Sequence, residues 1–385
     1  MLFPAPLPIP NHRTAMRILD LACLLSVTAV ALPSQTTHLV GPGGFATLPA
    51  ALAVAAPGDV ILVQAGTYAD ALDADLGVTI RALGVVQIQQ SAFTQWNVPA
   101  GQTLHLDGLS FVGSLHVASG RATLANCTVT PAFGTSTPAL TAKDCSVHLD
   151  GCTLTSLYTA PFASNLVGTL VENADLTAVD TSFAAGGAFV PAASVRATNS
   201  RFVASNCVFQ SVLPNSGGNC VVANGGSLVW LTDSTLTSGP SACPIVATGA
   251  TVRHERCTLS ATTATNCAVA APGPTLLGST TPVLLQNGND YAMQLRAAPS
   301  QLVAVLASSG VATTFAPGVL EQPLYLDTTS FWLAGVYVTD ALGAVTITWS
   351  MPAGQFVDSP LWLQAITVEP AFPWQASPVV GGIVR

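Results

Sequence analysis

Apolar and polar residues alternate in short runs between residues 78 and 259, and one eight-residue pattern returns along this stretch. Each copy has two alternating apolar residues, a polar pair that often ends in Asn or Asp, and then a small or apolar residue followed two places later by another apolar one. Such alternation is the period of a half-buried β-strand, and no copy has the period of an α-helix. The copies are VTIRALGV (78–85), LHLDGLSF (104–111), ATLANCTV (122–129), VHLDGCTL (147–154), FVASNCVF (202–209), VWLTDSTL (229–236) and VRHERCTL (252–259).

The spacing of the copies predicts the coils of a solenoid. A period of roughly 20–50 residues is typical of stacked repeats, and strands without helices favour a β-solenoid, whose coils stack as parallel strands about 4.8 Å apart. A second register, anchored on Cys145 and Ser200, also fits the middle of the chain. With the sixth residue of each copy as anchor, the anchors are Leu83, Leu109, Cys127, Cys152, residue 181, Cys207, Ser234 and Cys257, which lie 18 to 29 residues apart.

The polar pair in each copy predicts a sharp bend, because Asn and Asp tolerate the left-handed backbone conformation that branched residues avoid. Val, Leu and Cys then point inward, and equivalent side chains of successive coils stack in columns. A glycine precedes many copies, as expected of a turn between strands; these are Gly101, Gly120, Gly226, Gly249 and Gly273.

The segment before the first copy predicts a capped end. Thr47 is suited to an N-cap and Pro49 to a first turn, so we expect a short helix over Ala50–Ala56 that covers the open end, followed by a first strand at Val60–Val63. The run FATLPAALAVAAPGDVILVQAGTY (45–68) resembles the opening of right-handed parallel β-helix proteins of the pectin-lyase-like group. The resemblance covers residues 38 to about 275. It implies the fold and leaves the activity open, because that fold carries lyases, glycosidases, tail spikes and adhesins.

From about residue 276 the repeat stops and strand-like runs are separated by turn signals, which predicts a small antiparallel β-sandwich. It resembles C-terminal domains that follow repeats in large secreted bacterial proteins, and the resemblance implies surface attachment or secretion. We therefore expect three segments: 1–34, 35–275 and 276–385. The strand-like runs are Thr281–Leu285, Gln301–Ala307, Pro323–Leu326, Trp332–Thr339, Ala344–Ser350 and Leu361–Val368.

Residues 1–34 read as a misassigned start followed by a signal peptide: Met16-Arg17, an apolar run to Val30, and a small-x-small site at Ala29–Ala31. We expect a secreted or cell-surface protein without a membrane span in the mature chain. The net charge of −8 argues against a nucleic-acid partner. Only 8% of the residues are charged, which fits a solenoid because a column of like charges would repel along the whole stack.

Removal of Cys23 leaves eight cysteines in an oxidising compartment, so the sequence permits disulfides. The alternative is a set of stacked, reduced core residues. Cys220, Cys243 and Cys267 are expected at equivalent places in successive coils. The full set is Cys127, Cys145, Cys152, Cys207, Cys220, Cys243, Cys257 and Cys267.

The outward columns contain the candidate site. His105/Asp107 and His148/Asp150 share one face, two coils and roughly 10 Å apart, and paired acids at such a separation can perform general acid/base chemistry on a sugar chain. The alternative is a set of ordinary solvent-facing polar residues. Further along the same columns, Trp230 offers a platform for a sugar ring, with Arg253 and Glu255 beside it in the next coil.

Other chemistry has weaker support. The paired aspartates, Gly-His-Gly and Arg-x-Lys of polygalacturonase-like enzymes are absent, and Lys143 is the only lysine. Asp70, Asp73 and Asp75 are close enough to bind Ca²⁺, but the sequence favours a solvated loop after Tyr68 over a metal site. We expect no cofactor. The sequence favours a non-catalytic exported β-helix protein that is structural or adhesive, or that interacts with cell-surface polysaccharide; the alternative is a polysaccharide lyase or glycoside hydrolase that uses the outer face.

Overall fold

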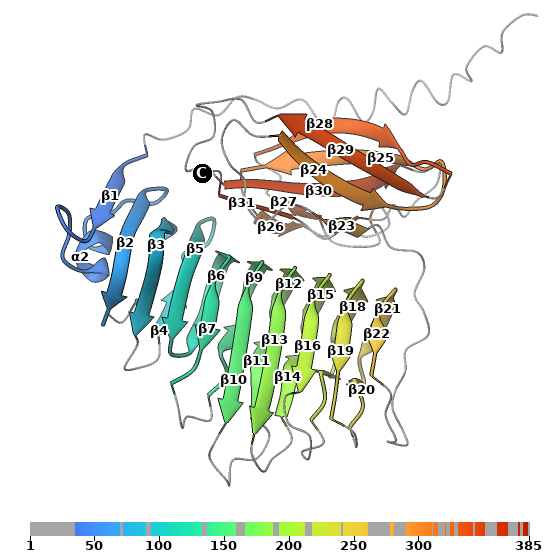
Figure 1. The fold of residues 1–385 in the computed structure, drawn as a ribbon, viewed down its shortest axis with the longest axis horizontal. Coiled ribbons are helices and arrows are strands. Elements are labelled where there is room, and N and C mark those ends of the chain that lie inside the picture. Colours follow the sequence, from blue (N-terminus) through green and yellow to red (C-terminus); the bar gives the residue numbers. More distant parts are fainter. Residues whose placement is uncertain are drawn as a thin grey trace, which may run out of the picture.

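The computed structural model describes most of a parallel β-solenoid and the strands of a C-terminal antiparallel module (Figure 1). Among these residues, no helix is long and apolar enough to cross a bilayer. The described residues are 35–69, 72–89, 94–132, 137–158, 166–187, 192–211, 218–239, 242–260, 278–280, 290–309, 311–314, 320, 324–326, 330–341, 343–350, 360–368, 376–377 and 380–383.

The solenoid strands form three rows, and all their printed pairings are parallel. Each of the last five coils contributes one strand to each row. The first row contains β2 (Val60–Tyr68), β3 (Thr79–Gln89), β5 (Thr103–Val112), β6 (Leu115–Ala125), β9 (Cys145–Asp150), β12 (Asp175–Val179), β15 (Arg201–Ser205), β18 (Leu228–Thr232) and β21 (Thr251–Glu255). The second contains β7 (Thr128–Thr130), β10 (Thr153–Tyr158), β13 (Ser182–Gly187), β16 (Val208–Ser211), β19 (Thr235–Thr237) and β22 (Thr258–Leu259). The third contains β4 (Thr94–Asn97), β8 (Leu140–Lys143), β11 (Leu166–Glu172), β14 (Ala192–Thr198), β17 (Val221–Asn224) and β20 (Ile245–Thr248). The N-terminal part of β6 also belongs to the third row, where it pairs with β4 and with β8.

A short helix covers the N-terminal end of the solenoid, as predicted, but its bounds differ. The helix α2 spans Leu48–Leu52, and the Thr47 hydroxyl accepts a hydrogen bond from the Ala50 amide at 3.3 Å. Leu48 is fully buried in the solenoid core, which explains why the helix begins two residues before the predicted Ala50. The first strand is also earlier than expected, because β1 (Thr37–Val40) pairs with β2.

The register confirms every predicted anchor from Leu109 onward. Ser110, one residue after the first of them, pairs with Thr128, and Thr128 with Thr153; the series then continues through Ser182, Val208, Thr235 and Thr258. Leu83 was wrong as an anchor. A register shift between Arg81 and Val86 places Val86 opposite Leu109 and leaves Leu83 exposed.

The structure contains both predicted registers, because each regular coil has two corners that are built from the same types of residue. Residues with φ near +50° precede a small residue at both corners, and this small residue is buried except at Cys257, which is half-buried. At one corner these are Asn126, Asp180, Asn206, Asp233 and Arg256, and at the other Asp144, Asn173 and Asn199. Cys145 and Ser200 belong to the second corner. Among the glycines, Gly225 rather than Gly226 has the positive φ, and Gly273 lies outside the described residues.

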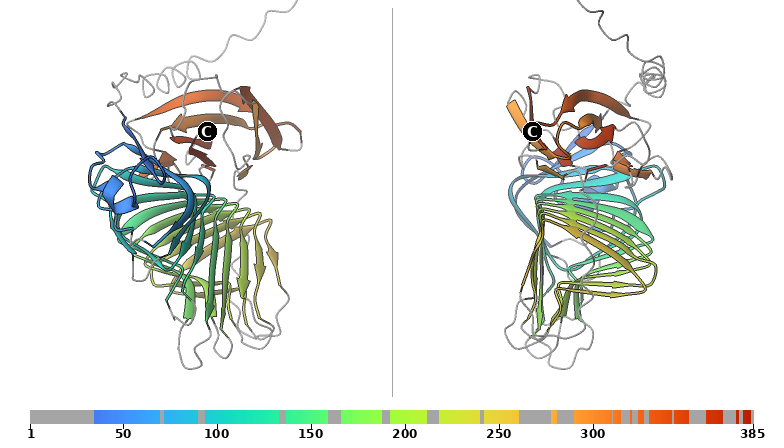
Figure 2. Two further views of the ribbon diagram at one scale, coloured as in Figure 1. Left: turned by 60° about the vertical axis from the view of Figure 1, so that its left-hand side comes forward. Right: turned by 90° about the vertical axis from the view of Figure 1, so that its right-hand side faces the viewer.

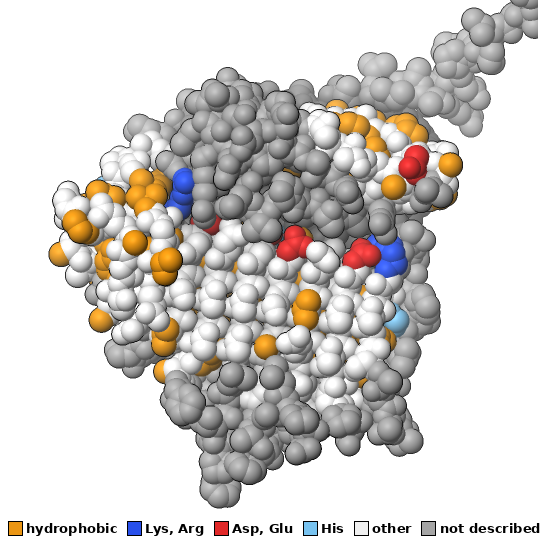
Figure 3. Space-filling model, viewed as in Figure 1, with side chains coloured by type: hydrophobic (Ala, Val, Ile, Leu, Met, Phe, Trp, Pro, Cys, Tyr) orange, Lys and Arg blue, Asp and Glu red, His pale blue; other side chains and the backbone are white. Residues whose placement is uncertain are grey.

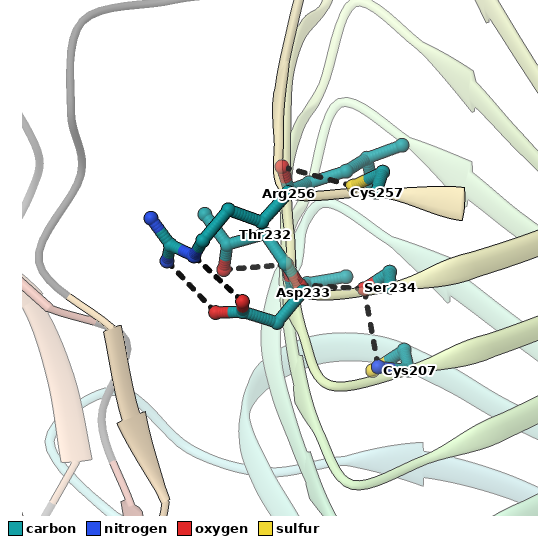
Figure 4. Close-up of polar contacts among 8 residues, drawn as sticks. Cys207, Thr232, Asp233, Ser234, Arg256 and Cys257 are labelled. Carbon is teal, nitrogen blue, oxygen red and sulfur yellow. Dashed lines mark hydrogen bonds and ion pairs between the residues drawn. The ribbon is translucent and has the colours of Figure 1, made fainter. Parts of the chain in front are cut away.

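The bend explains the cysteines and corrects the disulfide interpretation. Six cysteines are free thiols, at positions 127, 145, 152, 207, 220 and 257. At the first corner the small buried residue donates to the carbonyl two residues earlier, as Cys207 does to Ser205 at 3.2 Å and Ser234 to Thr232 at 2.8 Å. The Ser234 hydroxyl also accepts from the Cys207 amide of the preceding coil (Figure 4). A thiol or hydroxyl at the first corner therefore serves as a hydrogen-bond donor within the bend.

The remaining two cysteines differ from this pattern. Cys243 is disulfide-bonded, and the six free cysteines exclude every other described cysteine as its partner. Cys220 is not equivalent to Cys243, because Val221 pairs with Ile245 and the register places Cys220 opposite Pro244. Cys267 lies outside the described residues.

The C-terminal module contains two antiparallel sheets that share one apolar cluster, which confirms the predicted sandwich. One sheet has the order β23 (Gly278–Thr280), β24 (Asp290–Arg296), β29 (Ala344–Ser350); the other has the order β28 (Phe331–Val338), β25 (Leu302–Ser308), β30 (Pro360–Val368), β31 (Val380–Ile383). A further pair joins β26 (Val311–Thr314) to β27 (Leu324–Leu326). The predicted strand Thr281–Leu285 lies outside the described residues, and β24 was not predicted.

The module lies along the first row of the solenoid (Figures 1 and 2). Both faces of the inner strands β25 and β30 of its four-stranded sheet are buried. On β25, Val303 and Val305 point into the sandwich, whereas Ala304 and Leu306 belong to the cluster that contains Val203 of the solenoid. By contrast, the exposed sheet surface below the module has few charged side chains (Figure 3).

Candidate functional site

The structure brings the four predicted site residues together in the predicted register. His105 pairs with Thr123 and Thr123 with His148, so the two histidines lie two coils apart in one column. Asp107 and Asp150 follow the same relation through Ala125 in the next outward column. The columns continue as predicted through Trp230 and Arg253 on one side and Thr232 and Glu255 on the other.

The expectation that this face is open to solvent was wrong. His105 is 8% exposed, Asp107 1%, His148 1% and Asp150 6%. The cause is the C-terminal module, whose strands β26 and β31 contact β9 and whose β30 places its Trp362 against both histidines. The face points outward from the solenoid and forms the interface with the module.

Trp362 lies between the two histidines. Its indole stacks on His105 with ring centroids 6.4 Å apart, and meets His148 edge to face at 4.9 Å. The strand threonines hold both imidazoles: Nδ1 of His105 is 2.5 Å from the Thr123 hydroxyl, and Nδ1 of His148 is 2.7 Å from that of Thr177.

Burial keeps these imidazoles uncharged. Desolvation lowers the pKa of His105 to about 4, and desolvation together with the charge of His105 lowers the pKa of His148 to about 3. Nε2 of His148 and Nε1 of Trp362 are buried without a hydrogen-bond partner. An imidazole that stays neutral in this environment can accept or donate a hydrogen bond, but it has no access to a ligand while the module is docked.

The second predicted group is also at the interface. Trp230 is 3% exposed, packs with Val203 against the module, and has an unpartnered Nε1. The guanidinium of Arg253 lies 5.6 Å from the centre of its ring, a cation–π distance. Glu255 is on β21 opposite Thr232, but its side chain lies outside what the structure describes.

The acidic loop has no described metal site. Asp73 accepts a hydrogen bond from the Gln95 amide at 3.2 Å, and Asp75 lies in the same connection before β3. Asp70 lies outside the described residues. Within the described ranges, no group of three His, Cys, Asp or Glu residues is placed to hold a metal ion.

A polar groove that the sequence did not predict follows the corner before the first row. It has a volume of about 740 Å³ and is lined by residues at equivalent places in six successive coils, of which the four central coils contribute polar side chains. Since neighbouring coils are about 4.8 Å apart, the groove runs for about 24 Å along the solenoid. Its lining includes Arg121, Asp144, Ser146, Asn173, Asp175, Asn199 and Arg201. The sequence feature that could have indicated the groove is the column of residues at this corner, where polar residues stand in place of the glycines of the first coils.

The groove presents both hydrogen-bond donors and hydrogen-bond acceptors. Arg201 pairs with Asp175 at 3.3 Å, and the side-chain Oδ1 of Asn199 accepts from the backbone amide of Gly226 at 3.3 Å. Of the described lining residues, Arg121 and Asn173 make no side-chain hydrogen bond, so their donors face the groove unused. Two arginines and two aspartates give a balanced charge, which suits a hydroxyl-rich ligand without net charge.

Comparison with models of protein families finds no match to the chain, and comparison with curated proteins finds none. Among solved structures, the chain is similar to a full-length tailspike protein 2 from an Escherichia coli O157:H7 bacteriophage, with 10% identity and a TM-score of 0.27 over 86% of this chain. The chain spans 60% of that tailspike. The enzymatically active domain of bacteriophage CBA120 tailspike protein 2 gives the same identity and TM-score, over 91% of this chain and 77% of that domain. Similarity at this level assigns neither a family nor an activity.

Proposed function

We propose that this protein is an exported, non-catalytic β-helix that binds a neutral polysaccharide along its axial groove. The observation that carries the proposal is the repetition of polar side chains in the four successive central coils of one groove, from Arg121 to Arg201. A linear polymer lying parallel to the axis would meet a polar side chain in each of these coils. Because each contact is weak and exposed, affinity would come from their number.

The chemistry of the groove supports binding rather than turnover. Asp175 is paired with Arg201, which favours its ionised form and makes it a poor general acid. The groove has no His or Lys among its lining residues. The two predicted histidines, which are the better acid/base candidates, are buried beneath the module.

The alternative is a polysaccharide lyase or glycoside hydrolase that uses His105, Asp107, His148 and Asp150. It is favoured by one observation, the placement of the two His/Asp pairs two coils apart on one face. Turnover by that face requires the module to move away.

Sedimentation of the full chain with insoluble neutral polysaccharides tests the proposal. We expect binding to amylose, cellulose or mannan, weakened at least fivefold in Arg121→Ala, whose guanidinium is free to reach a ligand. Gln210→Ala on the exposed surface of β16 is the matched control and should bind as wild type. Absence of binding to all three polymers, or equal loss in both variants, would contradict the proposal. If wild type releases reducing ends from a polymer and Asp150→Ala does not, the alternative of a lyase or hydrolase is favoured.

A further inference from the structure

We propose that the C-terminal module is a removable cover over a second saccharide-binding strip, and that acidification releases it. The strip is the outward face of β5, β6, β9, β12, β15 and β18. Its ligand-facing residues are His105, Asp107, His148, Asp150 and Trp230. The inference takes its ligand class from the proposed function, but it concerns residues outside the groove, so variants separate the two.

The covered face is polar where a permanent interface would be apolar. Burial of imidazole and carboxylate groups against a module carries a desolvation cost, yet two coils contain both, at His105/Asp107 and His148/Asp150. The coils beyond them use Val203 and Trp230 in the same column. The chain therefore tolerates apolar residues in this column, and the His/Asp pairs are not required by the docking itself.

Three buried nitrogens at this interface lack a partner: Nε2 of His148, Nε1 of Trp362 and Nε1 of Trp230. Each would gain a hydrogen bond to water or to a ligand when the module moves away, and an unmade buried hydrogen bond costs stability. These three groups therefore reduce the free-energy difference by which the docked state is favoured over the open state. An interface optimised only for permanent closure would pair them or replace them.

The open strip matches a neutral sugar chain. Its His/Asp half provides donors and acceptors for hydroxyl groups, and the indole of Trp230 provides an apolar platform five coils further on from His105. In the docked state the indole of Trp362 occupies the space between the two imidazoles, and in the open state a sugar ring would occupy that space. The carboxylates of Asp107 and Asp150 disfavour an acidic chain by repulsion.

Acid favours the open state because the module offers no counter-charge to a protonated histidine. The strands that lie on the strip are β25, β26, β27, β30 and β31, and none contains Asp, Glu, Lys, Arg or His. On the solenoid side, the hydroxyls of Thr123 and Thr177 contact the imidazoles, and the two aspartates lie in the adjacent column.

The direction of the pH effect follows from the pKa values. The pKa values of His105 and His148 in the closed form are lowered by burial, to about 4 and about 3, and return to the ordinary value of about 6.5 on opening. A change from pH 7 to pH 5 starts just above this window and ends inside it, so it favours opening by about 20-fold per histidine.

Small-angle scattering of the full chain and sedimentation with amylose, cellulose and mannan form the test. Wild type at pH 5 and Trp362→Ala at pH 7 should both have a larger radius of gyration than wild type at pH 7, and should bind at least one polymer at least tenfold more tightly. The double variant His105→Phe/His148→Phe keeps ring contacts with Trp362 but cannot be protonated, so it should stay compact at pH 5. If wild type at pH 5 and Trp362→Ala at pH 7 both keep the radius of gyration of wild type at pH 7, the proposal that the module is a removable cover is wrong.

Second-site variants separate the strip from the groove. In the Trp362→Ala background, Trp230→Ala should remove the gain in binding, whereas Arg121→Ala should leave it. Loss of the gain in Arg121→Ala but not in Trp230→Ala would place the new binding in the groove and refute the strip while leaving the proposed function intact. If neither the closed nor the open protein binds any polymer, both proposals fail.

Discussion

The imidazole of His148 meets the indole of Trp362 edge to face, with ring centroids 4.9 Å apart and planes at 90°. His148 belongs to β9 of the solenoid, and Trp362 to β30 of the C-terminal module. This contact turns an outward column of the solenoid into the interior of an interface. The chemistry of the predicted site therefore depends on whether the module is docked.

Folding stability should fall as the pH drops below 6.5. The pKa values of His105 and His148 are lowered in the folded state, so the unfolded chain binds protons first as the pH falls. Stability is fully present above about pH 6.5 and is lost progressively down to about pH 3–4. At pH 5 the loss should be about 2 kcal/mol per histidine, measurable by urea denaturation at pH 7 and pH 5.

The matched control for this effect is His116, which is half-buried on the third row. Partial burial also lowers the pKa of His116, so His116→Gln should remove a small part of the pH dependence, whereas His148→Phe should remove a much larger part. A pH profile that is the same in His148→Phe and wild type would show that His148 is not the titrating group.

The inner column of the second row should be the most sensitive part of the core. Phe209 stacks on Phe183 with centroids 5.0 Å apart and planes 3° from parallel, and also contacts Phe202. Phe209→Ala should lower the free energy of unfolding by about 3–5 kcal/mol through the cavity it leaves. The exposed neighbour, in Gln210→Ala, should change it by less than about 0.5 kcal/mol. Similar losses in the two variants would contradict the assigned register.

The left-handed bends should accept glycine and reject branched residues. Asn206 has φ of 52°, and its amide donates to the Asp180 carboxylate at 2.5 Å. Asn206→Val should cost about 1–2 kcal/mol in backbone strain, and Asn206→Gly should cost less because glycine avoids that strain. Thermal denaturation ranks the two variants by stability. If Asn206→Val is more stable than Asn206→Gly, the claim that a branched residue is strained at this bend is wrong.

The cysteines at the bends should resist thiol reagents in the folded protein. Burial raises the pKa of Cys145 to about 12 and that of Cys220 to about 12, and it also raises the pKa of Cys127 and Cys207. The thiolate is the reactive form, so these four thiols should label at pH 7.5 only after denaturation. Immediate labelling without denaturant, or no labelling after it, would contradict free buried thiols.

The solenoid register could be predicted because each coil repeats a local rule. The αL residue, the small donor after it and the alternating apolar residues recur in sequence, so Cys127, Cys152 and Cys207 align without any knowledge of the fold. Leu83 failed as an anchor because a bulge after Arg81 adds residues to one coil, and periodicity carries no information about such an insertion.

The burial of the candidate site could not be predicted in the same way. Periodicity tells which side chains of β9 point outward, but not which distant surface meets them. One signal was present: β25 and β30 read as continuous apolar runs rather than alternating ones, as strands buried on both faces do. That signal predicts a second partner for the sheet without identifying the solenoid as that partner.

Carbethoxylation of the histidines by diethylpyrocarbonate, mapped by mass spectrometry on the full chain at pH 7, tests the covered site most directly. The account predicts that His105 and His148 react far more slowly than the half-buried His116, and that Trp362→Ala raises their rates to a comparable value. Modification of His105 and His148 in wild type as fast as His116 would contradict a solenoid face buried beneath the module.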